Sequence, residues 1–211
     1  METEEKEKRV YMNEKFFDLK KDKQDRMINA ALKVFALNGY KHASTDDIVA
    51  EAGISKGLLF HYFTNKLGLY TFLYDYSVRF MALELSTSTG GEEDDFFELL
   101  KKTENAKMQV LKNYPYMQLF IDSIRYEDVK EALYATEEKK DLLFEARKAV
   151  MDRADMSRFK PEVDICKLNH MIEYTIRGMM EESFLDNSFH PDMMNEEIGD
   201  YLLMLRKLTY I

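Results

Sequence analysis

The sequence predicts an all-α fold, and three observations support that prediction. The chain of 211 residues holds only 8 Gly and 3 Pro, so few residues interrupt its helices. Apolar residues recur at steps of three and four, as they do on one face of a helix, and no stretch alternates as a strand does. We therefore expect about nine helices.

The first residues are polar and lack periodicity, so we expect residues 1–19 to form a flexible N-terminal leader. From Lys21 onward an amphipathic pattern predicts a first helix. We expect it to end at Gly39, because glycine readily adopts a left-handed cap. Its apolar face holds Met27, Ile28, Ala31, Leu32 and Phe35.

Two short helices are predicted next. We expect Thr45 to cap the second helix, which stops at Gly53, and Ser55 to cap a third that runs from Lys56 to Phe63. Two helices joined by a tight glycine turn and held together by apolar side chains are typical of a helix-turn-helix. The expected contacts between them come from Ile48, Ala52, Ile54, Leu59 and Phe63.

A long fourth helix is predicted from Lys66 to about Ser86, and the loop Thr87–Gly91 follows it. Further helices are expected over residues 92–113, 115–125, 127–154, 162–186 and 191–210. The prediction therefore divides the chain into the leader, a helix-turn-helix domain over residues 20–66, and a helical body over residues 67–211.

Charge is distributed unevenly between these parts. The whole chain has 30 Lys+Arg and 39 Asp+Glu, a net charge of −9, which argues against binding nucleic acid or membranes by bulk charge. Residues 20–66 hold 8 basic and 5 acidic residues, or +3, whereas residues 67–211 hold 18 and 28, or −10. A local basic site in the first part is consistent with this partition.

Several classes of protein are disfavoured by composition. The single cysteine, Cys166, excludes an intrachain disulfide and a multi-cysteine metal site. The charged N-terminus has no apolar run behind it, so we expect no signal peptide, and no apolar run is long enough to span a membrane. We expect a cytoplasmic protein with no membrane partner, no metal and no cofactor.

The third helix presents a set of residues suited to DNA. Lys56 can reach a guanine edge or a phosphate, Gly57 allows close backbone approach, and Leu58 can meet a thymine methyl group. Donors to phosphates are available from His61, Tyr62 and Lys66. The alternatives are that Tyr62 only packs in the core and that the two lysines are solvated surface charges.

Taken together, these residues resemble the DNA-binding domain of the TetR family of bacterial transcriptional regulators. The matching marks are Ala31–Phe35, Asn38–Tyr40, Ser44–Thr45, Asp47–Ile48, Ala52–Gly57, Phe60–Phe63 and Asn65–Lys66. Two positions depart from the pattern, Val49 where alanine is frequent and Asp46 where some members have a basic residue.

The resemblance implies a homodimer that binds a palindromic operator, with recognition helices about 34–36 Å apart. It places Thr45 at a phosphate and assigns DNA contacts to Lys56, Gly57, Leu58, His61, Tyr62 and Lys66. It also implies a repressor that a small effector releases. Partner binding by the same fold without specific DNA binding is the alternative.

The last two helices are the expected dimer interface. Their apolar stripes contain Ile172, Ile176 and Met180, and Ile198, Leu202 and Leu205. Such stripes are more often intramolecular core. The resemblance favours pairing of these helices across a four-helix interface.

A ligand cavity is expected in the body. We assign its lining to Met108, Met117, Phe120, Ile124, His170, Tyr174 and Arg177. Methionine suits a cavity that adapts to ligands of different shape, although these residues would equally fill a helical core. The resemblance favours an apolar or aromatic effector, with the long fourth helix coupling its site to the DNA-binding domain.

An enzyme is the alternative to a regulator. His170 and Glu173 have the spacing found in di-iron helical bundles, but that chemistry needs a second pair and two further carboxylates that the sequence does not supply. No phosphate-binding loop, nucleophile elbow or metalloprotease motif is present in the sequence. We therefore expect no catalytic activity.

Overall fold

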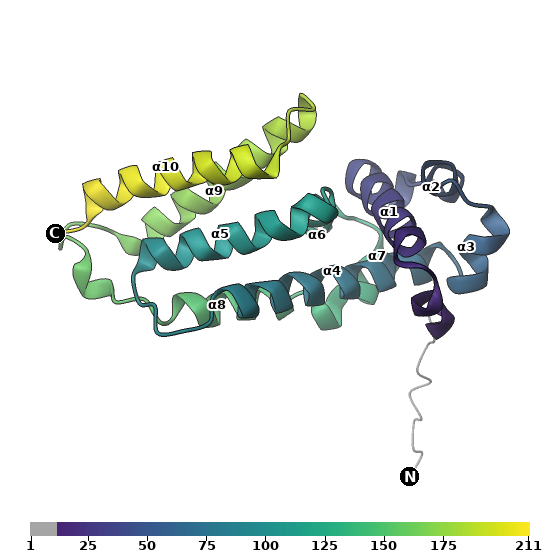
Figure 1. The fold of residues 1–211 in the computed structure, drawn as a ribbon, viewed down its shortest axis with the longest axis horizontal. Coiled ribbons are helices and arrows are strands. Elements are labelled where there is room, and N and C mark those ends of the chain that lie inside the picture. The colour runs from purple at the N-terminus through teal and green to yellow at the C-terminus, as the bar shows by residue number, and fades with distance from the viewer. Residues whose placement is uncertain (1–11) are drawn as a thin grey trace, which may run out of the picture. The chain divides into compact units, whose positions relative to one another are not determined.

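The computed structural model describes residues 12–211, and the all-α prediction is confirmed over them (Figure 1). These residues form two compact units, one of residues up to Val78 together with Tyr116–Lys140, and one of Arg79–Pro115 together with Asp141–Ile211. The predicted boundary at residue 66 therefore differs from the observed division. The first unit extends beyond the predicted helix-turn-helix domain because residues 116–140 belong to it, and α6 within them packs on α1.

The first unit contains the predicted short helices. Its elements are a 3-10 helix η1 (Glu14–Asp18), α1 (Lys21–His42), α2 (Thr45–Ala52), α3 (Lys56–Tyr62), the first part of α4 (Lys66–Ser88), α6 (Met117–Ser123), η2 (Ile124–Tyr126), α7 (Lys130–Thr136) and η3 (Glu137–Lys139). Within α1 the backbone breaks at Gly39, which has φ 66° and ψ 173°. The first helix was predicted to end at Gly39, and the structure has a kink there, after which α1 continues to His42.

The second unit contains the remaining helices. Its elements are the last part of α4, α5 (Phe96–Asn113), α8 (Leu142–Met151), the 3-10 helix η4 (Met156–Arg158), α9 (Ile165–Leu185) and α10 (Pro191–Thr209). Pro191 occupies the first turn of α10, where its missing N–H is not needed. None of the helices within residues 12–211 is long and apolar enough to cross a membrane.

One predicted helix is divided. The single helix expected over residues 127–154 is α7 and α8, separated by η3 and a turn. The interruption falls on residues 137–141, five consecutive charged residues with no apolar side chain to hold a helix against the core. The hydroxyl of Thr136 also donates to the carbonyls of Ala132 and Leu133 at the point where α7 ends.

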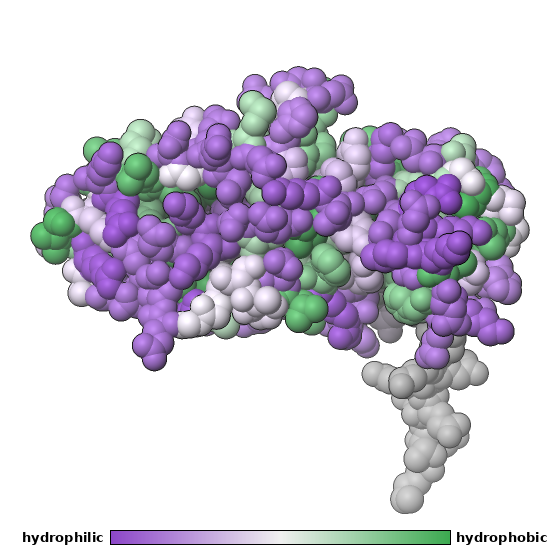
Figure 2. Space-filling model, viewed as in Figure 1, coloured by the Kyte–Doolittle hydropathy of each residue, from purple (hydrophilic) through white to green (hydrophobic). Residues whose placement is uncertain are grey.

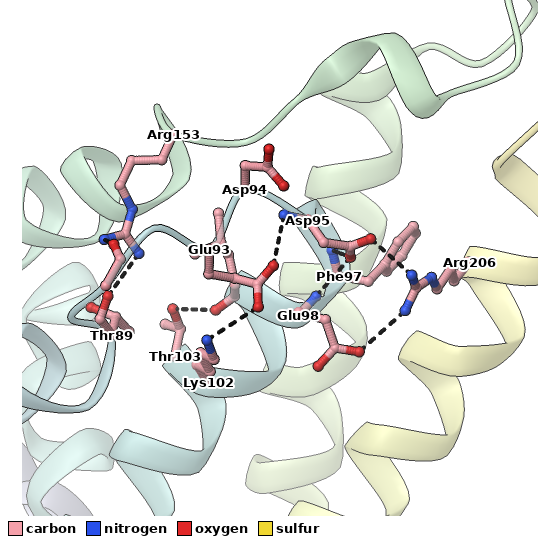
Figure 3. A network of polar contacts seen from close by, with 12 residues as sticks. Thr89, Glu93, Asp94, Asp95, Phe97, Glu98, Lys102, Thr103, Arg153 and Arg206 are labelled. Carbon is pink, nitrogen blue, oxygen red and sulfur yellow. Dashed lines mark hydrogen bonds and ion pairs between the residues drawn. The ribbon is translucent and has the colours of Figure 1, made fainter.

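A buried carboxylate organises one end of the second unit (Figure 3). One Asp95 side-chain oxygen accepts from the backbone N–H groups of Phe97 and Glu98, both at 3.0 Å, and so caps α5. Its other oxygen accepts from Arg206 of α10 at 2.9 Å and Arg158 at 3.1 Å. Asp95 therefore ties α5, η4 and α10 together, along the side on which α10 packs against α5.

The end of the expected flexible leader is packed into the first unit, which corrects that prediction for residues 12–19. Residues 1–11 lie outside the described part of the chain. Met12 forms an antiparallel bridge with Phe63, and the N–H of Asn13 donates to the carbonyl of Tyr62 at 2.8 Å. Phe16 of η1 is fully buried. The sequence pattern does not reveal this packing, because the segment is too short for its aromatic residues to show a periodicity.

Replacing Phe16 by alanine should lower the free energy of unfolding by about 3–5 kcal/mol, because its ring packs among Tyr62, Phe63 and Phe72 and would leave a cavity. Phe17→Ala is the matched control, since that ring is 52% exposed, and it should cost less than about 1 kcal/mol. Urea denaturation followed by circular dichroism measures both values. Equal losses for the two variants would contradict the packed role of η1.

Candidate nucleic-acid interface

The turn between α2 and α3 is made by Gly53, which has the left-handed conformation φ 63°, ψ 41°. A side chain is strained in this conformation, so the sequence needs glycine at this position. The N–H groups of Gly53 and Ile54 donate back to the carbonyls of Ala50 and Val49, which closes the last turn of α2. The predicted turn is therefore present.

The apolar residues expected to fix α3 against α2 are buried or partly buried, and the two helices pack together. Ile48, Ala52, Leu59 and Phe63 are buried, and Ile54 is partly buried. Because these side chains occupy one face of each short helix, the opposite face of α3 is left toward solvent. The orientation of α3 thus follows from burial and not from charge.

Both short helices begin with a serine cap. The Ser55 hydroxyl accepts from the N–H of Leu58 at 3.2 Å, as predicted. For α2 the prediction named the wrong residue, because Ser44 is the cap and accepts from the N–H of Asp46 at 3.1 Å. Thr45 lies inside the first turn and is partly exposed.

Three of the residues assigned to DNA contact are exposed on α3, and a fourth is partly exposed. Lys56, Gly57 and His61 are exposed and Leu58 is partly exposed. The Lys56 ammonium donates to the two carboxylate oxygens of Asp46 at 2.8 and 3.1 Å. Lys56 is therefore exposed but already paired.

Tyr62 was expected to point outward and is instead 9% exposed. Its ring packs edge-on against Phe16 and against the imidazole of His61. It also lines a shallow hollow of about 460 Å³, together with residues such as Phe60 and Thr64. Tyr62 thus holds α3 in place and still borders accessible space beside it.

Lys66 lies at the start of α4 and is half-buried. Its ammonium sits 4.5 Å from the centre of the Tyr40 ring and donates to the carbonyl of Lys41 at 3.4 Å. Burial lowers the pKa of Lys66, against the opposing effect of the carboxylates of Glu131 and Glu127. Lys66 is therefore held by neighbouring groups within the first unit.

Tyr40, Glu127 and Glu131 form a cluster that the sequence did not identify. The Tyr40 N–H donates to Glu127 at 2.8 Å and its hydroxyl donates to Glu131 at 2.7 Å. The other oxygen of Glu127 accepts from the N–H groups of Asp128 and Val129 ahead of α7. These partners are 87 and 91 residues away in the chain, so only the tertiary structure brings them together.

The residues assigned to a cavity lining are divided between the two units and between buried and exposed positions. Tyr174 is 65% exposed and His170 is exposed, so neither side chain is enclosed within the described chain. They lie on the opposite face of α9 from the buried residues Leu168 and Ile172. The ring of Phe120 is fully buried and packs against Phe35, Tyr70 and Tyr74.

The other assigned lining residues are distributed in the same way. Met108 and Met117 are buried, whereas Ile124 and Arg177 are partly exposed. Arg177 lies over the ring of Tyr174, 5.4 Å from its centre, on the exposed side of α9. A hollow of about 430 Å³ in the second unit is instead lined by residues of α5 and α10, such as Phe97 and Leu203.

The stripes assigned to a dimer interface are intramolecular. Five of the six residues are buried within the single chain, and Leu205 is partly buried (Ile172, Ile176, Met180, Ile198, Leu202, Leu205). The exposed apolar side chains of these helices are different ones, namely Met171, Tyr174, Leu185, Met193, Tyr201, Leu203, Met204 and Leu208. Each helix therefore has a buried stripe and an exposed apolar stripe. Figure 2 shows one face of the molecule, on which hydrophilic residues predominate and hydrophobic residues form smaller patches.

Within residues 12–211 no group of three or more His, Cys, Asp or Glu side chains is arranged to hold a metal ion. His170 stacks on Tyr174 with ring centres 6.2 Å apart, and Glu173 accepts from Asn169. Among the described residues, the contacts found for this pair thus lie along its own helix.

Comparison with known proteins identifies a related family and fold. Residues 27–71 match the family described as bacterial regulatory proteins, tetR family. No protein with a curated description matches the chain in sequence. The matched segment contains α2, the Gly53 turn and α3.

Solved structures of similar fold cover nearly the whole chain. A Clostridium perfringens protein described as a fatty acid metabolism regulator has a TM-score of 0.61 and 20% identity, covering 84% of this chain and 96% of that one. A TetR family transcriptional regulator from Chloroflexus aurantiacus has a TM-score of 0.55 and 20% identity, covering 95% and 99%. The fatty acid degradation regulator FadR of Bacillus halodurans has a TM-score of 0.50 and 22% identity, covering 85% and 97%.

The bond between Tyr40 and Glu131 predicts a dependence of stability on pH. Burial, the Glu131 hydrogen bond and nearby carboxylates raise the pKa of Tyr40 well above its ordinary value of 10.0. Because the folded-state pKa is raised, the stabilisation is complete below pH 10 and is lost as pH rises above it. Tyr40→Phe should therefore lower the free energy of unfolding by about 1–2 kcal/mol at pH 7.

The difference between Tyr40→Phe and the unaltered protein should shrink at about pH 10.5 and above, as measured by urea denaturation. Tyr134→Phe is the control, because that side chain is 80% exposed, and it should leave stability unchanged at both pH values. A difference for Tyr40→Phe that stays constant between pH 7 and pH 11 would contradict the assignment.

Proposed function

We propose that this chain, whose residues 27–71 match the family of bacterial regulatory proteins called tetR, is a dimeric repressor that leaves a palindromic operator when a small apolar effector binds. The match over residues 27–71 supports a DNA-binding transcriptional regulator rather than an enzyme. The observation that carries the proposal is the pair of serine-capped short helices joined at Gly53, with one face of α3 exposed.

The proposed DNA contacts combine base reading with phosphate binding. Lys56, Gly57 and Leu58 on the first turn of α3 would meet base edges in the major groove. Phosphates would be bound by Thr45, His61, Tyr62 and Lys66 at the edges of that surface. If each protomer neutralises about 3–4 phosphates, the log–log salt slope of binding for the dimer would be about −5 to −7.

A homodimer would supply the second recognition helix. We place its interface on the exposed apolar stripes of α9 and α10, in place of the buried stripes first expected. Met171, Tyr201 and Leu208 are members of this exposed set. Apolar side chains of this size at solvent-facing positions of two adjacent helices in the sequence are typical of an interaction surface.

The effector is proposed to be apolar. Two proteins of similar fold are described as regulators of fatty acid metabolism or degradation, which adds fatty acyl compounds to the candidate class. Helix α4 belongs to both units, since α4 begins at Lys66 and continues into the second unit. It would therefore couple effector binding to α3. Mass spectrometry of small molecules that co-purify with the protein would identify the class.

Gel shifts with a duplex from the chain's own upstream region test the DNA proposal. Tyr62→Phe removes only a hydroxyl and Lys66→Ala removes a cation, and each should weaken binding about five- to tenfold through the loss of phosphate contacts. Tyr134→Phe should bind as the unaltered protein does.

Unchanged affinity in both Tyr62→Phe and Lys66→Ala would reject these contacts. If the unaltered protein binds no duplex from its upstream region or from a randomised library, the fold would serve partner binding without DNA. Circular dichroism of each variant controls for loss of structure.

Sedimentation of the double variant Met171→Glu and Leu208→Glu tests the dimer. Both side chains are exposed in the single chain, so two buried charges at an interface should yield a folded monomer. Leu37→Glu, at an exposed apolar position of α1, should remain a dimer. A double variant that sediments as a dimer would place the interface elsewhere.

A further inference from the structure

The start of α3 carries an ion pair that links the two helices of the DNA-reading motif. Asp46 is in the first turn of α2 and Lys56 is the first residue of α3. The Lys56 Nζ atom lies 2.8 and 3.1 Å from the two Asp46 carboxylate oxygens. The turn at Gly53 brings these residues together across ten positions of sequence.

This pair is exposed at the surface of the first unit. The Lys56 side chain is 52% exposed and that of Asp46 is 69% exposed. Exposed pairs of this kind contribute little to stability, so the contact is not needed to hold α2 and α3 together. That task belongs to the buried residues Ile48, Leu59 and Phe63. The pair is thus available for another role.

The carboxylate changes which DNA groups Lys56 can bind. A lysine ammonium has three donors, so Lys56 can keep Asp46 and still donate to the neutral O6 or N7 atom of a guanine. A phosphate is different, because its negative charge would be repelled by the adjacent Asp46 carboxylate. A paired Lys56 is therefore a better donor to a base edge than to the DNA backbone.

This distinction matters for discrimination between DNA sequences. Non-specific binding is driven by phosphate neutralisation and counterion release, whereas specific binding adds base contacts. A lysine whose charge is already neutralised contributes little to non-specific binding. It can still donate to a base edge and so contribute to specific binding. The effect is substantial in a segment whose net charge over residues 20–66 is only +3.

We propose that Asp46 is a specificity-determining residue, which holds Lys56 as a donor to base edges and withholds it from phosphates. The inference rests on the proposed DNA-binding function. The inference gives a role to Asp46, which stands where some members of the resembled family have a basic residue.

Two Asp-to-Asn variants test the inference with the same change in net charge. Asp46→Asn frees Lys56, whereas Asp47→Asn alters the next residue of the same helix turn, for which the structure shows no ion pair within residues 12–211. The probes are a mixed-sequence duplex of about 30 base pairs, which spans more than one half-site, and a duplex selected from a randomised library by the unaltered protein. Fluorescence anisotropy over a range of salt concentrations gives the affinities.

Asp46→Asn should bind the mixed-sequence duplex about two- to fivefold more tightly, with a salt slope steeper by about one unit per protomer. Its affinity for the selected duplex should change less than about twofold, so the specificity ratio falls. Asp47→Asn should change both affinities by less than about twofold. Adding Lys56→Ala to Asp46→Asn should abolish the gain on mixed-sequence DNA.

Equal effects of Asp46→Asn and Asp47→Asn would overturn the inference, because only net charge would then matter. A loss of affinity of Asp46→Asn for the selected duplex would also overturn it, since Asp46 would then contact a base itself. If the unaltered protein binds neither probe, the proposed function fails, and this result is distinct from a failure confined to the variants. Asp46→Ser serves as a second variant, and thermal unfolding verifies that each is folded.

Discussion

The left-handed backbone of Gly53 is the constraint on which the presentation of α3 depends. It lets α2 end and α3 begin within three residues, and the buried side chains of Ile48, Leu59 and Phe63 then fix the angle between them. A Cβ at this position would be strained by the conformation. The exposure of Lys56 and His61 on α3 is a consequence of this local geometry.

The same face of α3 is the proposed DNA-binding surface of a chain that is acidic overall. Few cations are present there, and each is held by a neighbouring group, Lys56 by Asp46 and Lys66 by the Tyr40 ring and a carbonyl. Under the proposed function, a surface with so few cations attracts phosphates less strongly than a highly basic one does. Its affinity for DNA would then depend more on geometric fit and on base contacts, which is where specificity arises.

Packing around α3 involves segments far away in the chain. Phe16 lies ahead of α1 and contacts Tyr62 from outside the helix-turn-helix. Glu127 and Glu131 follow α6, and they bind Tyr40, whose ring in turn supports Lys66. Through these contacts, residues on both sides of the motif contribute to the position of its charged groups.

Local sequence by itself determined the helical class, the turn at Gly53, the cap at Ser55 and the exposure of Lys56, Gly57 and His61. These features depend on backbone conformation and on periodic burial, which neighbouring residues report. The distribution of charge also sets residues 20–66, at +3, apart from residues 67–211, at −10.

Tertiary structure decided the features that depend on distant partners. The packing of Phe16, the carboxylates around Tyr40 and the pairing of Lys56 all join residues that no local pattern connects. The apolar stripes of α9 and α10 were visible in the sequence, but periodicity cannot tell which stripe the chain covers itself. That choice depends on how helices pack, because burial is a property of the whole fold and not of one helix.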